Sequence, residues 1–159
     1  MTRAFVGLGA NVGNAANTLR QALEELGALP GTRVAARSPL YRSAPIGFAD
    51  QPDFLNAVAE VRTSLSALEL LAALMDLESR HGRERPFPNA PRTLDLDLLL
   101  FGDEVLASDR LTLPHPRMHE RAFVLRPLLD LDPDLSIPGV GPARAQLAHC
   151  SNQRIERIA

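Results

Sequence analysis

Hydrophobic residues recur along the chain with two different periods, and the change of period predicts an alternation of strands and helices. The run RAFVGLGA at residues 3–10 is short and apolar, which is typical of a strand. A helix follows, which begins at Asn14 or Gly13 and is closed by Gly27. Its apolar positions recur every three or four residues and are Leu19, Ala22, Leu23 and Leu26.

Two extended segments and a second helix are expected next. Residues 32–43 and 54–63 have the composition of strands. The sequence SALE forms a capping box, in which Ser66 is the N-cap and Glu69 occupies the third helical position. The helix that it opens runs to about His81, where a glycine follows and ends it.

A leucine-rich strand follows the eleven-residue loop GRERPFPNAPR and completes the order strand, helix, strand, strand, helix, strand. This order predicts an α+β fold with a ferredoxin-like βαββαβ core, in which two helices pack on one antiparallel sheet. Residues 104–159 are expected to add a C-terminal α/β extension, with a short strand, one or two short helices broken at Pro127, and a polar tail. Because no repeat, linker or low-complexity tract interrupts it, we expect residues 1–159 to form a single domain.

Two aspartates interrupt the leucine-rich strand. On a strand, Asp95 and Asp97 share one face at a separation of about 6.5–7 Å. Two carboxylates at this separation repel each other by about 2–3 kcal/mol at an effective dielectric near 20. A cation between them or a well-solvated face is therefore required. The alternate positions are expected to face a core and are Leu94, Leu96, Leu98 and Leu100.

Composition excludes several kinds of site. The chain of 159 residues is 45% hydrophobic, as in ordinary globular proteins, and has no apolar run long enough for a membrane span and no signal-peptide pattern. We therefore expect a cytoplasmic protein without a membrane partner. All 17 basic residues are arginine, which excludes a lysine-bearing P-loop, a Schiff base and a lysine general base. The single Cys150 forms no internal disulfide and makes a thiolate zinc site improbable.

Arginines gather around the aspartate pair. Eight of the 17 lie within residues 80–126, although the formal net charge of the chain is −2. Acidic net charge and only 4% aromatic residues argue against a nucleic-acid partner. Solvated surface arginines are the plain alternative, but their density beside an acidic pair favours an anionic ligand.

Two further motifs allow more than one interpretation. The segment GLGANVGN resembles a dinucleotide fingerprint, but its GxGxxxG spacing is wrong, so a tight-turn role for Gly7, Gly9 and Gly13 is favoured. In HPRMH, His115 and His119 have a spacing that could bind zinc. The intervening proline and the missing HExxH glutamate favour a hydrogen-bonding or phosphate-contacting histidine instead.

The long loop at residues 82–92 contains three arginines and attaches directly to the aspartate strand, which is typical of a functional lid. Mg²⁺ is usually bound by one or two carboxylates together with substrate phosphates. Two such ions between Asp95 and Asp97 would cancel their repulsion and clamp a phosphoryl donor. The residues themselves thus predict metal-dependent phosphoryl or nucleotidyl transfer and leave the acceptor open.

Four segments together resemble the 6-hydroxymethyl-7,8-dihydropterin pyrophosphokinase family of folate biosynthesis. They are GLGANVGN near the start, YRSAPIGFADQPDFLNAV at 41–58, LESRHGRERPFPNAPRTLDLDLLLFG at 77–102 and LPHPRMHERAFVLRPL at 113–128. The resemblance covers nearly the whole chain. It implies a ferredoxin-like α+β fold and transfer of pyrophosphate from ATP to the hydroxymethyl group of the pterin, with release of AMP.

The resemblance also implies roles for individual residues. Asp95 and Asp97 would hold two Mg²⁺ ions that bridge the phosphates of ATP, and Arg83 and Arg92 would stabilise charge on the transferring group. The implied ATP-binding residues are Glu78, Arg85, Leu98, Arg110, Leu111, Thr112, His115 and Arg121. The implied pterin-binding residues are Ser43, Ala44, Ile46, Phe54, Asn56 and Phe123.

Physical chemistry supports the implied pterin slot, because a flat bicyclic ring suits two aromatic walls and Asn56 can donate and accept at its edge. Taken singly, either phenylalanine is more often plain core. The expected partners are small molecules only, and we expect a monomer. Two other classes stay open from the residues alone: a metal-dependent phosphoesterase that uses Asp95, Asp97 and the histidines, and a ferredoxin-like RNA-binding module.

Overall fold

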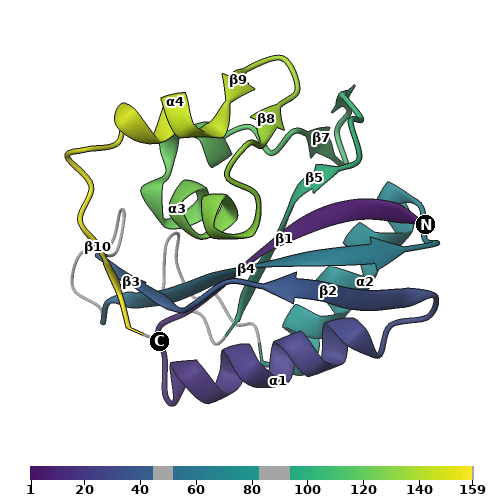
Figure 1. Ribbon diagram of the computed structural model, residues 1–159. Helices are drawn as coiled ribbons and strands as arrows, with labels where there is room; N and C mark the ends of the chain where they lie inside the picture. The colour runs from purple at the N-terminus through teal and green to yellow at the C-terminus, as the bar shows by residue number, and fades with distance from the viewer. Residues whose placement is uncertain (45–51, 83–93, 159) are drawn as a thin grey trace.

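The computed structural model describes residues 1–44, 52–82 and 94–158 (Figure 1). Its centre is an antiparallel sheet with the strand order β10-β3-β4-β1-β5, in which β2 also pairs with β4. β1 and β4 are the long central strands, and β5 pairs only with β1 among the described residues. The strands are β1 Thr2–Ala10, β2 Thr32–Arg37, β3 Tyr41–Ser43, β4 Phe54–Thr63, β5 Asp95–Phe101 and β10 Ile155–Arg157.

Two helices cover one face of this sheet, α1 at Ala15–Gly27 and α2 at Ala67–Arg80 (Figure 1). The side chain of Asn14 caps α1 by accepting a hydrogen bond from the backbone N–H of Asn17 at 3.2 Å. The capping box of α2 forms as the sequence predicts, with Ser66 and Glu69 bonded reciprocally. The predicted ferredoxin-like α+β arrangement is therefore confirmed.

The C-terminal part of the chain covers the other face (Figure 1). It contains the helices η1 Met118–Glu120, α3 Ala122–Leu131 and α4 Ala143–Ala148, with the strand pairs β6 Leu106–Ala107 with β7 Thr112–Leu113 and β8 Ser136–Ile137 with β9 Gly141–Pro142. In the described part of the chain, no helix is both long and apolar enough to span a membrane.

Alternation along the strands divides the interior into two cores. On β1, Ala4, Val6, Leu8 and Ala10 pack beneath α1 and α2, whereas Phe5 packs with α3 on the opposite face. On β5, the pairing register shifts between Phe5 and Val6, because Leu99 is an extra residue opposite them. The prediction that Leu100 shares a face with Leu94, Leu96 and Leu98 is therefore wrong, since this bulge turns Leu100 into the α3 core.

The segment predicted as one strand over 32–43 is two strands, β2 and β3. Ser38 uses its backbone N–H and its hydroxyl to bond the backbone of Val58, with distances of 2.9 Å for both. Pro39 has no N–H to continue the ladder, so the chain leaves β4 there and rejoins it at Tyr41, opposite Asn56.

One expectation for the C-terminal part is also wrong. Pro127 does not break a helix, because it is buried inside α3 among Leu125, Leu128 and Leu129, whose packing on the sheet holds the helix together. Within the polar tail, residues 155–157 form β10, a strand that the sequence did not predict, and pair with β3 (Figure 1).

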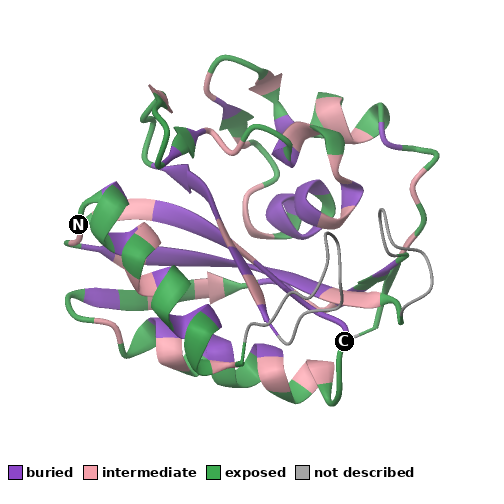
Figure 2. Cartoon of the chain, turned by 180° about the vertical axis from the view of Figure 1, so that it is seen from behind, coloured by how far each residue is buried: buried purple, intermediate pink, exposed green. Residues whose placement is uncertain are grey.

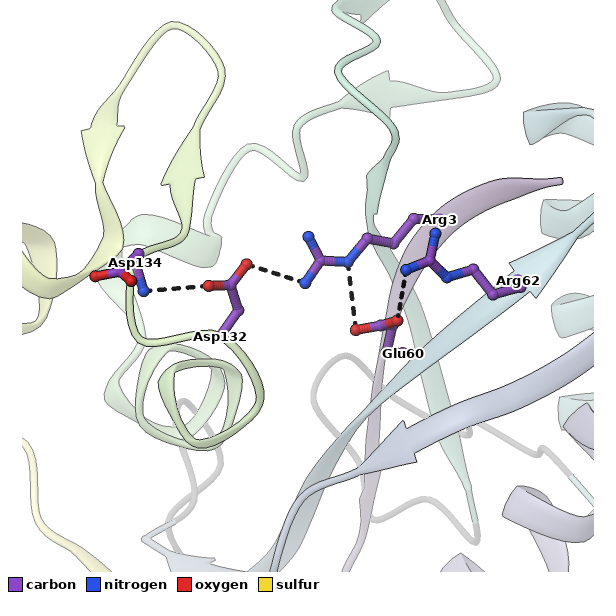
Figure 3. Close-up of polar contacts among 5 residues, drawn as sticks. All are labelled: Arg3, Glu60, Arg62, Asp132 and Asp134. Carbon is purple, nitrogen blue, oxygen red and sulfur yellow. Dashed lines mark hydrogen bonds and ion pairs between the residues drawn. The ribbon is translucent and has the colours of Figure 1, made fainter.

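Ion pairs attach the C-terminal end of α3 to the sheet (Figure 3). Arg3 on β1 contacts the carboxylate of Glu60 on β4 at 3.3 Å and that of Asp132 at 2.9 Å. Arg62 contacts Glu60 at 3.2 Å. The Arg3 guanidinium also lies 4.7 Å from the ring centroid of Phe5. These contacts fix the C-terminal end of α3 to the sheet.

Candidate active site

The sheet face on which α3 packs, called the α3 face below, also carries polar residues. The strand pairing aligns them in a row, which is the polar part of this face. On β1 and β5, Gly9 lies opposite Asp95 and Gly7 lies opposite Asp97. Gly9 also lies opposite Asn56 on β4. Because neighbouring strands are about 4.8 Å apart, Asp95 and Asn56 lie about 10 Å apart across the glycine. The carboxylate pair of β5 and the buried amide of β4 therefore lie on the two sides of a strip of β1 that has no side chains, because its residues on this face are glycines.

The glycines in this strip have a different role from the predicted one. Gly7 and Gly9 lie inside β1, so the tight-turn prediction is wrong for them; only Gly13 lies in the turn, with φ +65°. A Cβ added to Gly9 would lie 3.4 Å from Oδ1 of Asn56 and 3.9 Å from Cδ1 of Phe54. Glycine keeps the space above β1 open between these side chains.

Asp95 and Asp97 are half-buried and share the face opposite Leu94, Leu96 and Leu98, as the alternation predicts. Two carboxylates fit Mg²⁺, which takes oxygen ligands and completes its shell with water and substrate phosphates. Among the residues that the structure describes, no cluster of three histidine, cysteine or acidic side chains forms a closed protein site. The donor set therefore suits an open Mg²⁺ site that needs a phosphate ligand.

Glu78 is 3% exposed on α2, and its carboxylate reaches the free edge of β5. Its Oε2 accepts a hydrogen bond of 2.8 Å from the backbone N–H of Leu96, the residue between the two aspartates. That N–H points away from β1 and has no strand partner in the described sheet. Glu78 thus fixes the backbone that carries Asp95 and Asp97.

His115 lies beside the aspartates on the segment that follows β7, and its backbone N–H donates to the carbonyl of Leu99 at 2.9 Å. Burial, chiefly, lowers the pKa of His115 from 6.5 to about 4; the Arg121 and Arg117 charges lower it further, and Asp95 opposes them. The imidazole is therefore neutral at pH 7, and its contact with Asp97 at 3.8 Å is not a salt bridge.

Hydrogen bonding selects the tautomer of this neutral ring. Nδ1 of His115 accepts from the backbone N–H of Arg117 at 3.2 Å, which leaves the proton on Nε2, the atom that faces Asp97. His119 lies apart on η1, with its Nε2 3.7 Å from a carboxylate oxygen of Glu120. The geometry favours a histidine that donates to an anion over the zinc alternative.

The residues implied for the nucleotide pocket lie around the edge of β5. Leu98 and Leu111 are buried in the core beneath α1 and α2, on the side of β5 opposite the aspartates. Thr112 is exposed on β7, and Arg110 is exposed in the turn between β6 and β7. The structure therefore places Leu98 and Leu111 on the side of β5 opposite the aspartates, whereas Thr112 and Arg110 are exposed beside this strand.

The residues implied for the pterin slot gather at the start of β4. Asn56 and Ser43 are each 5% exposed. Nδ2 of Asn56 donates to Oγ of Ser43 at 2.8 Å and to the backbone carbonyl of Tyr41 at 3.4 Å. Both donor bonds point towards β3, so the acceptor Oδ1 lies on the side of Gly9. Phe54 is half-buried beside Gly9, and Ala44 follows β3 and is exposed.

Arg121 and Phe123 stand at the N-terminal end of α3, where both are half-buried. The Arg121 guanidinium carbon lies 5.5 Å from the ring centroid of Phe123. The Arg121 charge also lowers the pKa of His115, so Arg121 links the imidazole and the phenylalanine electrostatically. The remaining candidate residues, Ile46, Arg83, Arg85 and Arg92, and most of the predicted lid lie outside the described residues.

Sequence reasoning missed the strip formed by Gly7 and Gly9, although alternation along residues 3–10 could have placed both glycines on one face. It also missed Tyr41, whose hydroxyl donates to the carboxylate of Asp130 on α3. The two residues are 89 positions apart, and no local pattern links them.

Comparison with known proteins identifies the family of the chain. A family model described as 7,8-dihydro-6-hydroxymethylpterin-pyrophosphokinase (HPPK) matches residues 5–133. The 2-amino-4-hydroxy-6-hydroxymethyldihydropteridine pyrophosphokinase of Pseudomonas aeruginosa is 47% identical over 156 residues, covering 98% of this chain and 96% of that protein. The protein of the same name from Methylorubrum extorquens is 44% identical over 158 residues and 99% of both chains.

The fold also matches solved structures. Wild-type Plasmodium falciparum HPPK-DHPS superposes with a TM-score of 0.75 over 93% of this chain, at 15% sequence identity. This chain spans only 44% of that longer one, so the match concerns the fold alone. Sequence identity and the family match together decide the assignment. The chain belongs to the HPPK family, whose members transfer pyrophosphate from ATP to 6-hydroxymethyl-7,8-dihydropterin in folate biosynthesis.

Proposed function

We propose that the polar part of the α3 face is where this chain transfers pyrophosphate from ATP to the pterin hydroxymethyl group. The observation that carries the proposal is the row of Asp95, Gly9 and Asn56, which sets a metal-binding carboxylate and a buried amide about 10 Å apart across bare backbone. In the reaction, the substrate hydroxyl oxygen bonds to the β-phosphorus of ATP. The bond from that phosphorus to the oxygen of the α-phosphate breaks, AMP leaves, and the hydroxyl proton passes to solvent.

Asp95 and Asp97 hold two Mg²⁺ ions in this proposal. Bound there, the ions would supply positive charge that neutralises the phosphate oxygens around the β-phosphorus. The protein contributes a fixed backbone, because the Glu78 carboxylate bonds the peptide N–H between the two aspartates. The ions also remove the repulsion between the two carboxylates.

ATP bends around the free edge of β5. The base and ribose lie near Glu78, Leu98, Leu111 and Thr112, and the triphosphate crosses to the face of the aspartates. There the neutral His115 donates from Nε2 to a phosphate oxygen, and Arg121 supplies a positive charge. Arg110 is a further described arginine that we assign to the triphosphate. We assign Arg83, Arg85 and Arg92 to the same triphosphate from the sequence.

The pterin lies flat above Gly9, with Phe54 and Phe123 as its walls. Asn56 accepts from a ring N–H through Oδ1, because both N–H groups of its amide are already bonded to β3. Ser43 contributes by holding that amide, Ala44 continues the slot beyond β3, and we assign Ile46 to the slot from the sequence alone. The two substrates meet where the glycine strip borders Asp95.

Product analysis tests the proposal. With ATP, Mg²⁺ and the hydroxymethyl pterin we expect AMP and the pterin diphosphate in equal amounts, and no AMP when the pterin is omitted. Formation of AMP or ADP without pterin would instead identify a phosphoesterase. Chelation of Mg²⁺ by EDTA should stop turnover, and titration of rate against free Mg²⁺ reports whether one or two ions act.

We further propose that residues 1–159 act as a single-domain monomer in the cytoplasm. The contribution of both the first and the last strand to one sheet supports a single domain. Size-exclusion chromatography with light scattering tests the oligomeric state.

A further inference from the structure

The C-terminal segment after α4 contacts both sides of the proposed pterin slot. Its strand β10 pairs with β3, which carries Ser43, and the backbone N–H of Ile158 donates to the carbonyl of Leu40 at 2.9 Å. Before it reaches β3, the segment passes the N-terminal end of α3 (Figure 1). Gln153, which is half-buried, makes the contact there.

Gln153 uses both ends of its side-chain amide. Its Oε1 accepts from the backbone N–H of Ala122 at 2.9 Å, and its Nε2 donates to the backbone carbonyl of Glu120 at 2.6 Å. Ala122 is the first residue of α3, and the N-cap residue Arg121 provides no side-chain cap. A glutamine 31 residues away thus takes the place of the missing cap.

The two bonded backbone groups flank Arg121, and Phe123 follows directly. We propose that Gln153 is a positioning residue, which holds the turn at residues 120–122 so that Arg121 faces the triphosphate and Phe123 forms a wall of the pterin slot. The inference rests on the proposed function, because it assumes that the pterin lies against Phe123. It extends the site to the tail of the chain.

The contact between Arg121 and Phe123 explains why a small movement matters. The guanidinium lies 5.5 Å from the ring centroid, and both side chains project from the first turn of α3. First turns are the part of a helix that opens most easily when their N–H groups lack partners. Without Gln153, Arg121 and Phe123 would leave their positions together, while the ion pairs of Arg3 would still hold the other end of α3.

A plain tether is the competing explanation. In that case Gln153 only fastens the tail, its loss reduces overall stability, and the folded protein binds the pterin as before. Ligand affinity of the folded protein separates the two explanations, because a tether does not change it.

Gln153→Ala is the test variant, and Gln21→Ala is the matched control, since Gln21 is an exposed glutamine on α1. Phe123→Ala serves as the reference for the slot. We would measure the dissociation constant of the pterin with a non-hydrolysable ATP analogue and Mg²⁺ present, and the thermal midpoint of each protein. We expect about a 5- to 10-fold weaker pterin affinity for Gln153→Ala, the equivalent of about one hydrogen bond. The control should bind like the wild type.

An unchanged pterin affinity in Gln153→Ala, together with a weakened one in Phe123→Ala, overturns the inference and leaves the proposed function intact. An unchanged affinity in Phe123→Ala overturns the proposed slot itself. If Gln153→Ala is unfolded at the assay temperature, the comparison is made with Gln153→Glu. That variant keeps the acceptor for Ala122 but replaces the donor to Glu120 with a charged oxygen that repels the carbonyl, so the turn should shift, and wild-type affinity there overturns the inference as well.

Discussion

The two faces of the sheet differ although the same strands supply both (Figure 2). Beneath α1 and α2, aliphatic side chains such as Leu8 and Leu96 fill the whole interface. On the other face, α3 covers an apolar middle, ion pairs hold one end, and the carboxylates and Asn56 occupy the other. The contrast teaches that neighbouring residues of one strand can serve stability and chemistry separately.

The strongest test of this separation compares Asp97→Ala with Leu8→Ala. Asp97→Ala, like Asp95→Ala, should lower kcat by about a thousand-fold or more, because metal-ion charge stabilisation contributes several kcal/mol. Its urea midpoint should stay the same or rise, since one of two repelling charges is gone. Leu8→Ala should lose about 2–5 kcal/mol of unfolding free energy and keep the kcat of its folded fraction. Near-normal turnover of Asp97→Ala at saturating Mg²⁺ would contradict the metal assignment.

Within the polar face, Asn56→Ala should separate the two substrates. A ring N–H of the pterin would lose its acceptor in a dry slot, so pterin affinity should fall by about 100-fold. The affinity for ATP, measured by calorimetry without pterin, should change by less than about two-fold, which is within experimental scatter. Equal losses for both ligands would assign Asn56 a structural role.

Gly9→Ala sharpens the contrast by changing the bare strip itself. The added methyl would lie 3.4 Å from Oδ1 of Asn56 and occupy the floor of the slot. Pterin affinity should fall by about 10-fold, whereas the thermal midpoint should hold or rise, because alanine loses less backbone entropy than glycine on folding. Unchanged affinity would show that the ring does not lie above β1.

A last test, on stability and not on activity, is the pH dependence that His115 gives to the metal-free protein. Its pKa in the folded state is about 4, below the ordinary 6.5, so the unfolded chain binds this proton first as pH falls. The folded state should therefore lose stability between about pH 6.5 and pH 4, and the contribution is constant above pH 7. Arg121, Arg117, Asp95 and Asp97 are the charged groups around the ring.

Urea unfolding in EDTA across that range measures this effect. His115→Gln should reduce the slope of the unfolding free energy against pH, because it removes the contribution of the histidine. His149→Gln, at an exposed position, should leave that slope unchanged. Identical slopes for the wild type and His115→Gln would show that the imidazole is not buried as a neutral group.

Local signals in the sequence predicted the parts of the fold that local chemistry determines. Asn14, Ser66 and Glu69 cap helices through bonds that span three residues, and alternation alone placed Asp95 and Asp97 on one face. The bulge at Leu99 and the intact helix around Pro127 depend on packing against other elements, which the local pattern does not contain.

The site shows the same division. Its carboxylates and His115 stand in recognisable motifs, whereas the bonds that hold them join distant segments. Glu78 and Leu96 are 18 residues apart, and Gln153 and Ala122 are 31 apart. No spacing rule links such pairs, because the chain path between them decides which atoms meet.

The position of β5 has a consequence for solubility. Among the described residues β5 pairs with another strand on one side only, and a leucine-rich edge strand is a template on which a second chain could add, the first step of β-aggregation. At this edge the Glu78 carboxylate bonds the backbone N–H of Leu96 and His115 bonds the carbonyl of Leu99, while Asp95 and Asp97 add negative charge to the face of the strand. The aspartates that we propose as metal ligands would thus also act as gatekeepers, and replacing them should favour aggregation at high concentration even where the native fold gains stability.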